Sequence, residues 1–142
     1  MEERGSMKII KYPFEVKGDY RGSLVSVEAE TTIPFPIRRI YYIYGTKHDV
    51  VRGYHAHRSL KQVLICLSGS CTIVLDDGES RQEVPLSDPA EGLFIGSMIW
   101  REMKDFSPGA VLMVIASEHY NEADYIRDYA DFKKLSQANA SY

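Results

Sequence analysis

Cysteine is scarce in this chain, which has only Cys66 and Cys71 among its 142 residues. Two cysteines are too few for a disulfide framework or a cysteine-rich zinc site, so both are predicted to be reduced and buried. No apolar run approaches the ~20 residues that cross a bilayer, and the first residues, Met-Glu-Glu-Arg, are too charged for a secretion signal. These absences predict a cytoplasmic protein with no membrane partner.

The chain also lacks an excess of positive charge. Its formal net charge is −3 and its pI is about 5.8, so there is no general basic field to hold nucleic acid. An anionic ligand would have to be held by a local cluster of cations. The content of 44% hydrophobic and 26% charged residues is that of an ordinary globular protein.

The length of the chain fits one domain with a hydrophobic core of its own. Residues 1–6 precede a second methionine, Met7, and are expected to be an expression remnant. We therefore predict a single domain over residues 7–135. Residues 136–142 are expected to form a frayed tail.

Short apolar runs separated by turn residues dominate the chain, and this pattern is typical of a β-barrel or sandwich. Gly69-Ser70 and Asp76-Asp77-Gly78 are two of the turn signals. The pattern predicts an all-β jelly-roll barrel. The predicted strands cover residues 8–12, 24–28, 38–44, 51–57, 62–67, 72–75, 83–86, 92–95, 100–103 and 111–116.

One short C-terminal helix is predicted, from Asn121 to about Leu135. Asn121 can cap it, and Tyr125, Tyr129 and Phe132 follow at a spacing that places them on one helical face. We expect this aromatic face to cover one end of the barrel.

Two histidines carry the clearest chemical signal. His55 and His57 are two residues apart in a predicted strand, so their side chains project to the same side of the sheet. The strand that begins at Gln62 is expected to return beside them and to add its amide to the group. If this side faces the lumen, two imidazoles with ordinary pKa values of about 6.5 meet in a cavity, which suits proton transfer.

The His-x-His pattern resembles the first cupin motif, in which two histidines and a glutamate bind a metal. Here Gln62 occupies the glutamate position, and an amide is a poor substitute for a carboxylate on a divalent cation. The segment 96–101, where a further histidine ligand would lie, contains Arg101 instead. We therefore expect no metal.

Longer segments resemble the sugar 3,4-ketoisomerases, which are cupin enzymes that act on dTDP-4-keto-6-deoxyglucose. The likeness extends from about Lys8 to Leu135. The segments that carry it are RRIYYIY (38–44), RGYHAHR (52–58), QVLICLSGS (62–70), GLFIG (92–96), WREMKDFS (100–107) and DYIRDY (124–129).

This resemblance implies a cupin barrel that needs no cofactor and makes a dTDP-3-keto-6-deoxyhexose. Such products lead to amino sugars of surface polysaccharides, including lipopolysaccharide and S-layer glycans. It also implies a homodimer with exchanged N-terminal strands. The catalytic base of the family falls on His55 and its partner histidine on His57. Substrate contacts of the family fall on Arg21, Tyr41, Arg52 and Arg101.

The reaction itself requires a base for the C3 proton and a donor for the enediolate oxygen. His55 fits the base, and His57 or the Tyr41 hydroxyl fits the donor. The diphosphate requires cations, for which Arg21 and Arg52 are the first candidates and Lys61 a weaker one. Gln62 is also predicted to bind the substrate.

Three alternatives stay open at this point. The product could have the galacto or the gluco configuration at C4, and the surrounding sequence slightly favours galacto. The protein could instead be a sugar-nucleotide epimerase or a non-catalytic binding cupin. A metal-dependent cupin enzyme is the third alternative.

Overall fold

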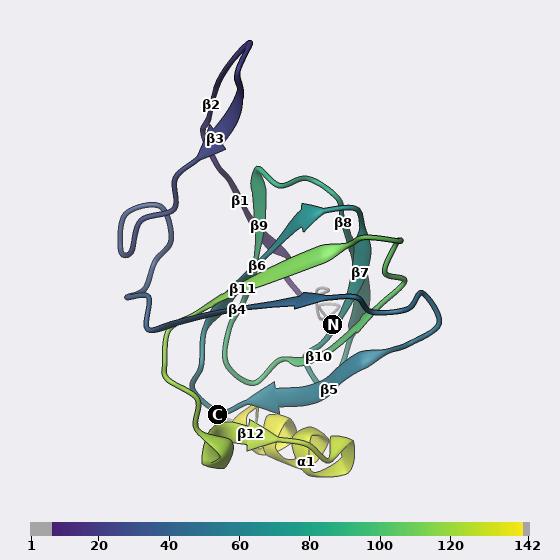
Figure 1. Cartoon of the computed structure of the whole chain (residues 1–142). Coiled ribbons are helices and arrows are strands. Elements are labelled where there is room, and N and C mark those ends of the chain that lie inside the picture. Colours follow the sequence, from purple (N-terminus) through teal and green to yellow (C-terminus); the bar gives the residue numbers. More distant parts are fainter. Residues whose placement is uncertain (1–6, 141–142) are drawn as a thin grey trace, which may run out of the picture.

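The structure is a computed structural model that describes residues 7–140, with side chains to residue 138. The predicted remnant at residues 1–6 lies outside the described residues, as do residues 141–142. Two five-stranded sheets face each other and form a barrel (Figure 1). Every strand pair within them is antiparallel, which confirms the predicted all-β jelly-roll barrel.

The strand order of each sheet shows which segments meet. The first sheet consists of β1 (Ile10–Pro13), β9 (Glu91–Ile95), β6 (Gln62–Ser68), β11 (Val111–Ala116) and β4 (Arg39–Tyr44). The second sheet consists of β12 (Tyr125–Ile126), β5 (Arg52–His57), β10 (Trp100–Lys104), β7 (Cys71–Asp76) and β8 (Arg81–Leu86).

The largest apolar cluster fills the barrel between the two sheets. Leu64, Ile73, Leu93 and Leu112 belong to it and are almost completely buried. They come from four strands that were predicted as short apolar runs, and they lie among the side chains that each strand points inward. Both cysteines are free and buried, as predicted.

A two-stranded hairpin stands away from the barrel (Figure 1). It consists of β2 (Val16–Asp19) and β3 (Gly22–Val25), which pair only with each other among the described strands. The sequence pattern predicts only one strand here, at 24–28, and does not predict β2. The reason is that both faces of the hairpin are exposed, so its residues show no alternation between apolar and polar side chains.

The C-terminal segment differs from its prediction. Asn121 accepts a hydrogen bond from the Ala123 amide, but it caps a single 3₁₀ turn, η1 (Glu122–Asp124). Strand β12 follows, and only then does helix α1 (Tyr129–Ala140) begin. The predicted start at Asn121 was therefore wrong, and the tail predicted to fray from residue 136 is helical to Ala140.

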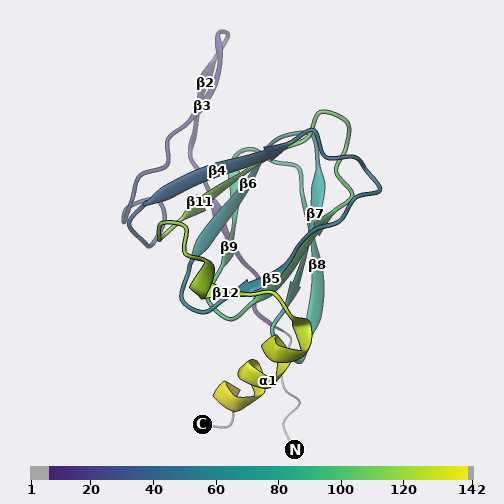
Figure 2. The same ribbon diagram turned by 60° about the horizontal axis from the view of Figure 1, so that its bottom comes forward.

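Helix α1 packs against one end of the barrel, as Figure 2 shows. Phe132 is fully buried, and its ring lies 5.8 Å from that of Trp100. The Tyr129 ring meets Trp100 edge-on at 5.2 Å. The predicted aromatic cover is confirmed for these two residues but wrong for Tyr125, which lies in β12. Within residues 7–140, no helix is long and apolar enough to cross a membrane.

Candidate active site

A bulge in strand β5 decides which of its side chains reach the lumen. Gly53 and Tyr54 have left-handed φ angles of 94° and 57°, and the register with β10 shifts at this point. Arg101 pairs with His55, and Met103 pairs with Arg52, so Tyr54 is the extra residue. Because paired residues point to the same face, Arg52 and His55 both face inward, which a regular strand would not allow.

His55 and His57 point to one side of β5, as predicted. Their rings lie 4.9 Å apart and nearly perpendicular. The Nδ1 atom of His55 lies 3.1 Å from the carbonyl oxygen of Gly53, which can only accept, so Nδ1 carries the proton and Nε2 is free to act as a base. Burial and the nearby Arg101 lower the pKa of His55 to about 4, so the ring is neutral at neutral pH.

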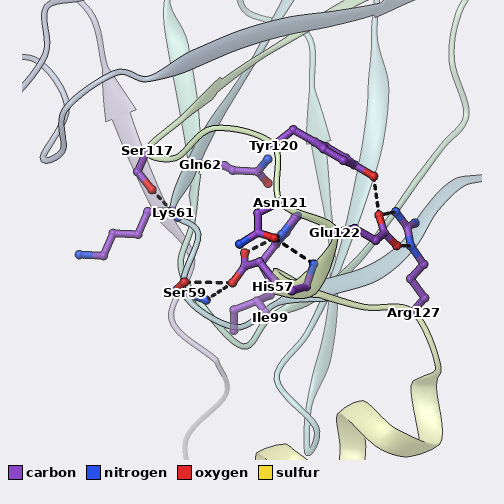
Figure 3. A network of polar contacts seen from close by, with 12 residues as sticks. His57, Ser59, Lys61, Gln62, Ile99, Ser117, Tyr120, Asn121, Glu122 and Arg127 are labelled. Carbon is purple, nitrogen blue, oxygen red and sulfur yellow. Dashed lines mark hydrogen bonds and ion pairs between the residues drawn. The ribbon is translucent and has the colours of Figure 1, made fainter.

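His57 lies deeper and is held by a carboxylate from another part of the chain. It is 1% exposed, and its Nδ1 donates to Asp124 Oδ2 at 3.1 Å. The other oxygen of Asp124 accepts from the backbone amide and the hydroxyl of Ser59, each at 2.9 Å (Figure 3). The Nε2 atom of His57 is buried and has no partner among the described residues. Burial, followed by Arg101, lowers the pKa of His57.

Segment 122–127 closes one side of the site. The Tyr125 ring lies 5.0 Å from that of His55 and 4.3 Å from that of His57. The Arg127 guanidinium covers Tyr125 at 4.2 Å and bonds to the carboxylate of Glu122. The sequence pattern does not assign Asp124, Tyr125 or Arg127 to the site. A two-residue strand is too short to produce a periodic signal, so only the family-like segment DYIRDY pointed to this region.

A chain of polar groups runs from Tyr41 and Gln62 in the opposite sheet to Arg101 in β10, the neighbour of β5. Gln62 Nε2 donates to the Tyr41 hydroxyl at 3.0 Å, and Arg101 Nη1 donates to Gln62 Oε1. Arg101 is 2% exposed, and its Nη2 donates to the carbonyl of Ile99 at 3.0 Å. Strand β6 pairs with β9 and β11 and not with β5, so the expectation that Gln62 returns beside the histidines was wrong. From across the barrel it bonds to Arg101, which pairs with His55 in the register of β10 and β5.

A cavity of about 330 Å³ lies beside these groups. Tyr41 and His55 line it from the two sheets, and Arg52, Tyr125 and Arg127 supply further polar groups. Arg52 is exposed, and its side chain has no hydrogen-bond partner in the described part of the chain. The cavity is therefore lined by the neutral imidazole of His55, three phenols and two cations. The second imidazole, His57, lies next to His55 outside this lining.

Two predicted site residues lie elsewhere. Arg21 is at the tip of the β2–β3 hairpin, where its guanidinium bonds to Asp19 at 2.6 Å and is 75% exposed. Lys61 does not line the cavity, and its exposed side chain points away from His57 and Gln62 in Figure 3, while its backbone amide donates to Ser117. Neither joins the site within this chain.

The donor set does not fit a divalent cation. Within residues 7–140 there is no group of three or more His, Cys, Asp or Glu side chains placed to hold a metal. At the positions where the cupin motif would supply the remaining metal ligands, this chain has the amide of Gln62 and the guanidinium of Arg101. The guanidinium is itself a cation.

Comparisons with known proteins agree with the geometry. The family model FdtA, described as WxcM-like, C-terminal, matches residues 6–137. A TDP-4-oxo-6-deoxy-alpha-D-glucose-3,4-oxoisomerase from Aneurinibacillus thermoaerophilus is 55% identical over 116 residues, which are 82% of this chain and 84% of that protein.

Two solved structures are similar over most of their length. A 3,4-ketoisomerase from Helicobacter canadensis is 52% identical, with a TM-score of 0.90 over 92% of this chain and 98% of that one. A histidine-to-asparagine mutant of the 3,4-ketoisomerase from Thermoanaerobacterium thermosaccharolyticum, in complex with TDP-4-keto-6-deoxyglucose, is 43% identical, with a TM-score of 0.90 over 92% and 94%. These matches confirm the resemblance on which the predicted family rested. The chain belongs to the FdtA family of WxcM-like proteins.

Proposed function

We propose that this protein is an isomerase that converts TDP-4-keto-6-deoxyglucose to a TDP-3-keto-6-deoxyhexose. The observation that carries the proposal is a pair of neutral imidazoles beside a cavity whose opposite wall presents the Tyr41 hydroxyl. The relatives named above are 3,4-ketoisomerases, and this site contains the base and the donor that such a reaction needs.

The isomerisation moves two protons. His55 Nε2 takes the proton from C3, and the C–H electron pair forms the C3–C4 double bond as the C4 carbonyl oxygen gains negative charge. The Tyr41 hydroxyl donates a hydrogen bond to that oxygen. Return of a proton to C4 and transfer of the O3 proton to the C4 oxygen then complete the 3-keto sugar. His57, oriented by Asp124, is placed beside His55 to accept and return a proton.

The face of the enediolate that receives the proton sets the configuration at C4. We propose the galacto product over the gluco product, because more of the sequence around the site resembles enzymes of that kind.

An NMR assay tests the activity. The chelator-treated protein is incubated with TDP-4-keto-6-deoxyglucose, and the 3-keto product is followed through its ring protons, whose couplings also report the C4 configuration. An unchanged carbonyl position with an inverted neighbouring carbon would indicate an epimerase, and no reaction would indicate a binding protein. Turnover that disappears with the chelator and returns with a metal would indicate a metal-dependent enzyme.

The pH dependence should follow the lowered pKa of His55. We expect kcat/KM to be level through neutral pH and to fall only as the pH approaches about 4, because protonation removes the base. The free energy of unfolding should decrease as the pH is lowered from about 6.5 to about 4, because in that range the unfolded histidines bind protons that the native ones do not. Rate profiles and chemical denaturation check both. An acidic limb centred near 6.5 would contradict the assignment.

Arg52 is proposed to hold the diphosphate. It faces the cavity beside His55 and is free to bond to an anion. Loss of a charge-assisted hydrogen bond should weaken TDP binding of Arg52→Ala by about 10-fold to 100-fold. Titration calorimetry measures this, with Arg38→Ala as the control because Arg38 is exposed and does not line the cavity. Equal affinity of both variants and the parent would remove Arg52 from the phosphate site.

We also propose that the enzyme is a cytoplasmic homodimer with exchanged N-terminal strands, acting in the synthesis of surface polysaccharides. The protruding hairpin supports the exchange, since Val16 and Leu24 are 49% and 58% exposed on it. Arg21 at its tip would then serve a partner's site. Free, buried cysteines agree with a reducing compartment. Light scattering should give twice the chain mass of 16.2 kDa, and a monomer at micromolar concentration would contradict the dimer.

A further inference from the structure

We infer that Gln62 and Arg101 act as positioning residues that direct the Tyr41 hydroxyl toward the enediolate oxygen and transmit to it the field of a buried cation. This inference rests on the proposed function. It gives the two residues a role behind the substrate, whereas the sequence analysis had placed them among its contacts.

The direction of the hydrogen bonds fixes where the Tyr41 hydroxyl proton points. A guanidinium can only donate, so the Gln62 atom that faces Arg101 must be the carbonyl oxygen Oε1. The amide nitrogen of Gln62 then faces Tyr41 and donates to its oxygen at 3.0 Å. Because the Tyr41 oxygen is already accepting there, its own proton is left for an acceptor in the cavity that Tyr41 lines.

Arg101 is a buried cation without a counter-charge in the part of the chain that the structure describes. Its guanidinium is bonded to the Gln62 amide and the Ile99 carbonyl, its Nε has no partner, and none of the described residues forms an ion pair with it. An unpaired buried cation costs several kcal/mol, so this arrangement is poor for stability alone. A negative charge that develops on the substrate would supply the missing counter-charge in a site from which water is largely excluded.

The groups around Arg101 do not neutralise it through an ion pair. The groups that face Arg101 are His55, His57, Tyr41, Tyr125 and Asp124. Of these only Asp124 is an anion at neutral pH, and its two oxygens are already bonded to His57 and Ser59. Asp124 therefore forms no ion pair with Arg101, and the guanidinium has no bonded counter-charge where it meets the Gln62–Tyr41 chain.

The first test changes the charge at position 101. Arg101→Met is neutral and unbranched, and its kcat should fall by about 10²-fold to 10³-fold, the effect of losing an oxyanion donor. Binding of TDP should change by less than about threefold. Thermal melting identifies any unfolded variant. A folded Arg101→Met protein with kcat within threefold of the parent would overturn the inference.

Arg101→Lys separates charge from structure. A buried lysine has a lowered pKa, so this variant should be more active than Arg101→Met at low pH and should lose that advantage as the pH rises and the lysine loses its proton. The parent should show no such limb, because its guanidinium stays protonated. A purely structural role for Arg101 predicts the same pH profile for both variants. That result would contradict the proposed effect of the Arg101 charge on Tyr41.

The second test cuts the chain at Gln62. Gln62→Glu keeps the size of the side chain but neutralises Arg101 and cannot donate to Tyr41, so kcat should fall by about 10²-fold. In a Tyr41→Phe background the same change should have almost no further effect, because the chain no longer reaches the substrate. Gln137→Glu, at an exposed helical position, is the charge-matched control, and all assays contain a chelator.

Different results would refute the ketoisomerase activity and the positioning role of Gln62 and Arg101. A parent protein without ketoisomerase activity would refute the proposed function. An active parent in which the effects of Gln62→Glu and Tyr41→Phe on kcat simply add would refute only the proposed role of Gln62 and Arg101.

Discussion

Replacing His55 by asparagine is expected to lower kcat by about 10²-fold to 10⁴-fold, the range for loss of a general base. The asparagine amide can still donate to the Gly53 carbonyl, as His55 Nδ1 does at 3.1 Å, so the bulge in β5 should hold its shape. It has no basic nitrogen to take the C3 proton. TDP binding should stay within a few-fold of the parent, since the proposed phosphate contact is Arg52.

His48→Asn is the matched control for this variant. Its Nδ1 also lies near a backbone carbonyl, that of Phe106 at 3.3 Å, but it does not line the cavity. Turnover is measured by NMR and exchange of the C3 hydrogen in D₂O is measured in parallel. His55→Asn should lose both, whereas His48→Asn should lose neither. Undiminished C3 exchange in His55→Asn would assign the base to another residue.

Asp124→Asn should lower kcat by about 10²-fold or more, because it changes the tautomer of His57. Oδ1 of Asp124 accepts two bonds from Ser59, one of them from a backbone amide that can only donate. An asparagine oxygen should keep that place, which turns the amide NH₂ toward His57 Nδ1. The histidine would then have to accept at Nδ1 and carry its proton on Nε2, so it could no longer accept one there.

Nitrogen-15 NMR can read this change directly, since the chain has only four histidines. The parent should show His57 protonated on Nδ1, and Asp124→Asn should show it protonated on Nε2. Asp128→Asn is the control, because an asparagine there can still cap helix α1 through the bond that Asp128 makes to the Asp131 amide. A slow Asp124→Asn variant with the parent tautomer would contradict this explanation and point to a loss of packing.

Local sequence patterns predicted those parts of the site that lie within one strand. His55 and His57 share a face because alternate residues of a strand do so, and nothing else in the fold is needed for that conclusion. The same pattern would have placed Arg52 on the other face. The left-handed residues Gly53 and Tyr54 reverse it, and their bulge is visible only in the register with β10.

The C-terminal segment shows why a helical spacing alone can mislead. Tyr125, Tyr129 and Phe132 have the spacing of one helical face, yet Tyr125 and Ile126 pair with β5 instead. Ile126 is 4% exposed in the cluster that also contains Ala56 and Trp100, so burial in tertiary contacts outweighs the local helical preference. Asp124 is thereby brought to His57, a partner 67 residues away in the chain.

The sequence by itself determined the barrel class, the inward pair of histidines and the family, because alternation along strands and specific strings of residues are local properties. Only the tertiary structure decided which side chains complete the site. Asp124 reaches His57 from a returning segment, Gln62 reaches Tyr41 and Arg101 between strands of two sheets, and Arg21 is carried away on a hairpin. Such pairings depend on strand register and sheet order, which arise from burial summed over the whole core and leave no periodic signal in a single segment.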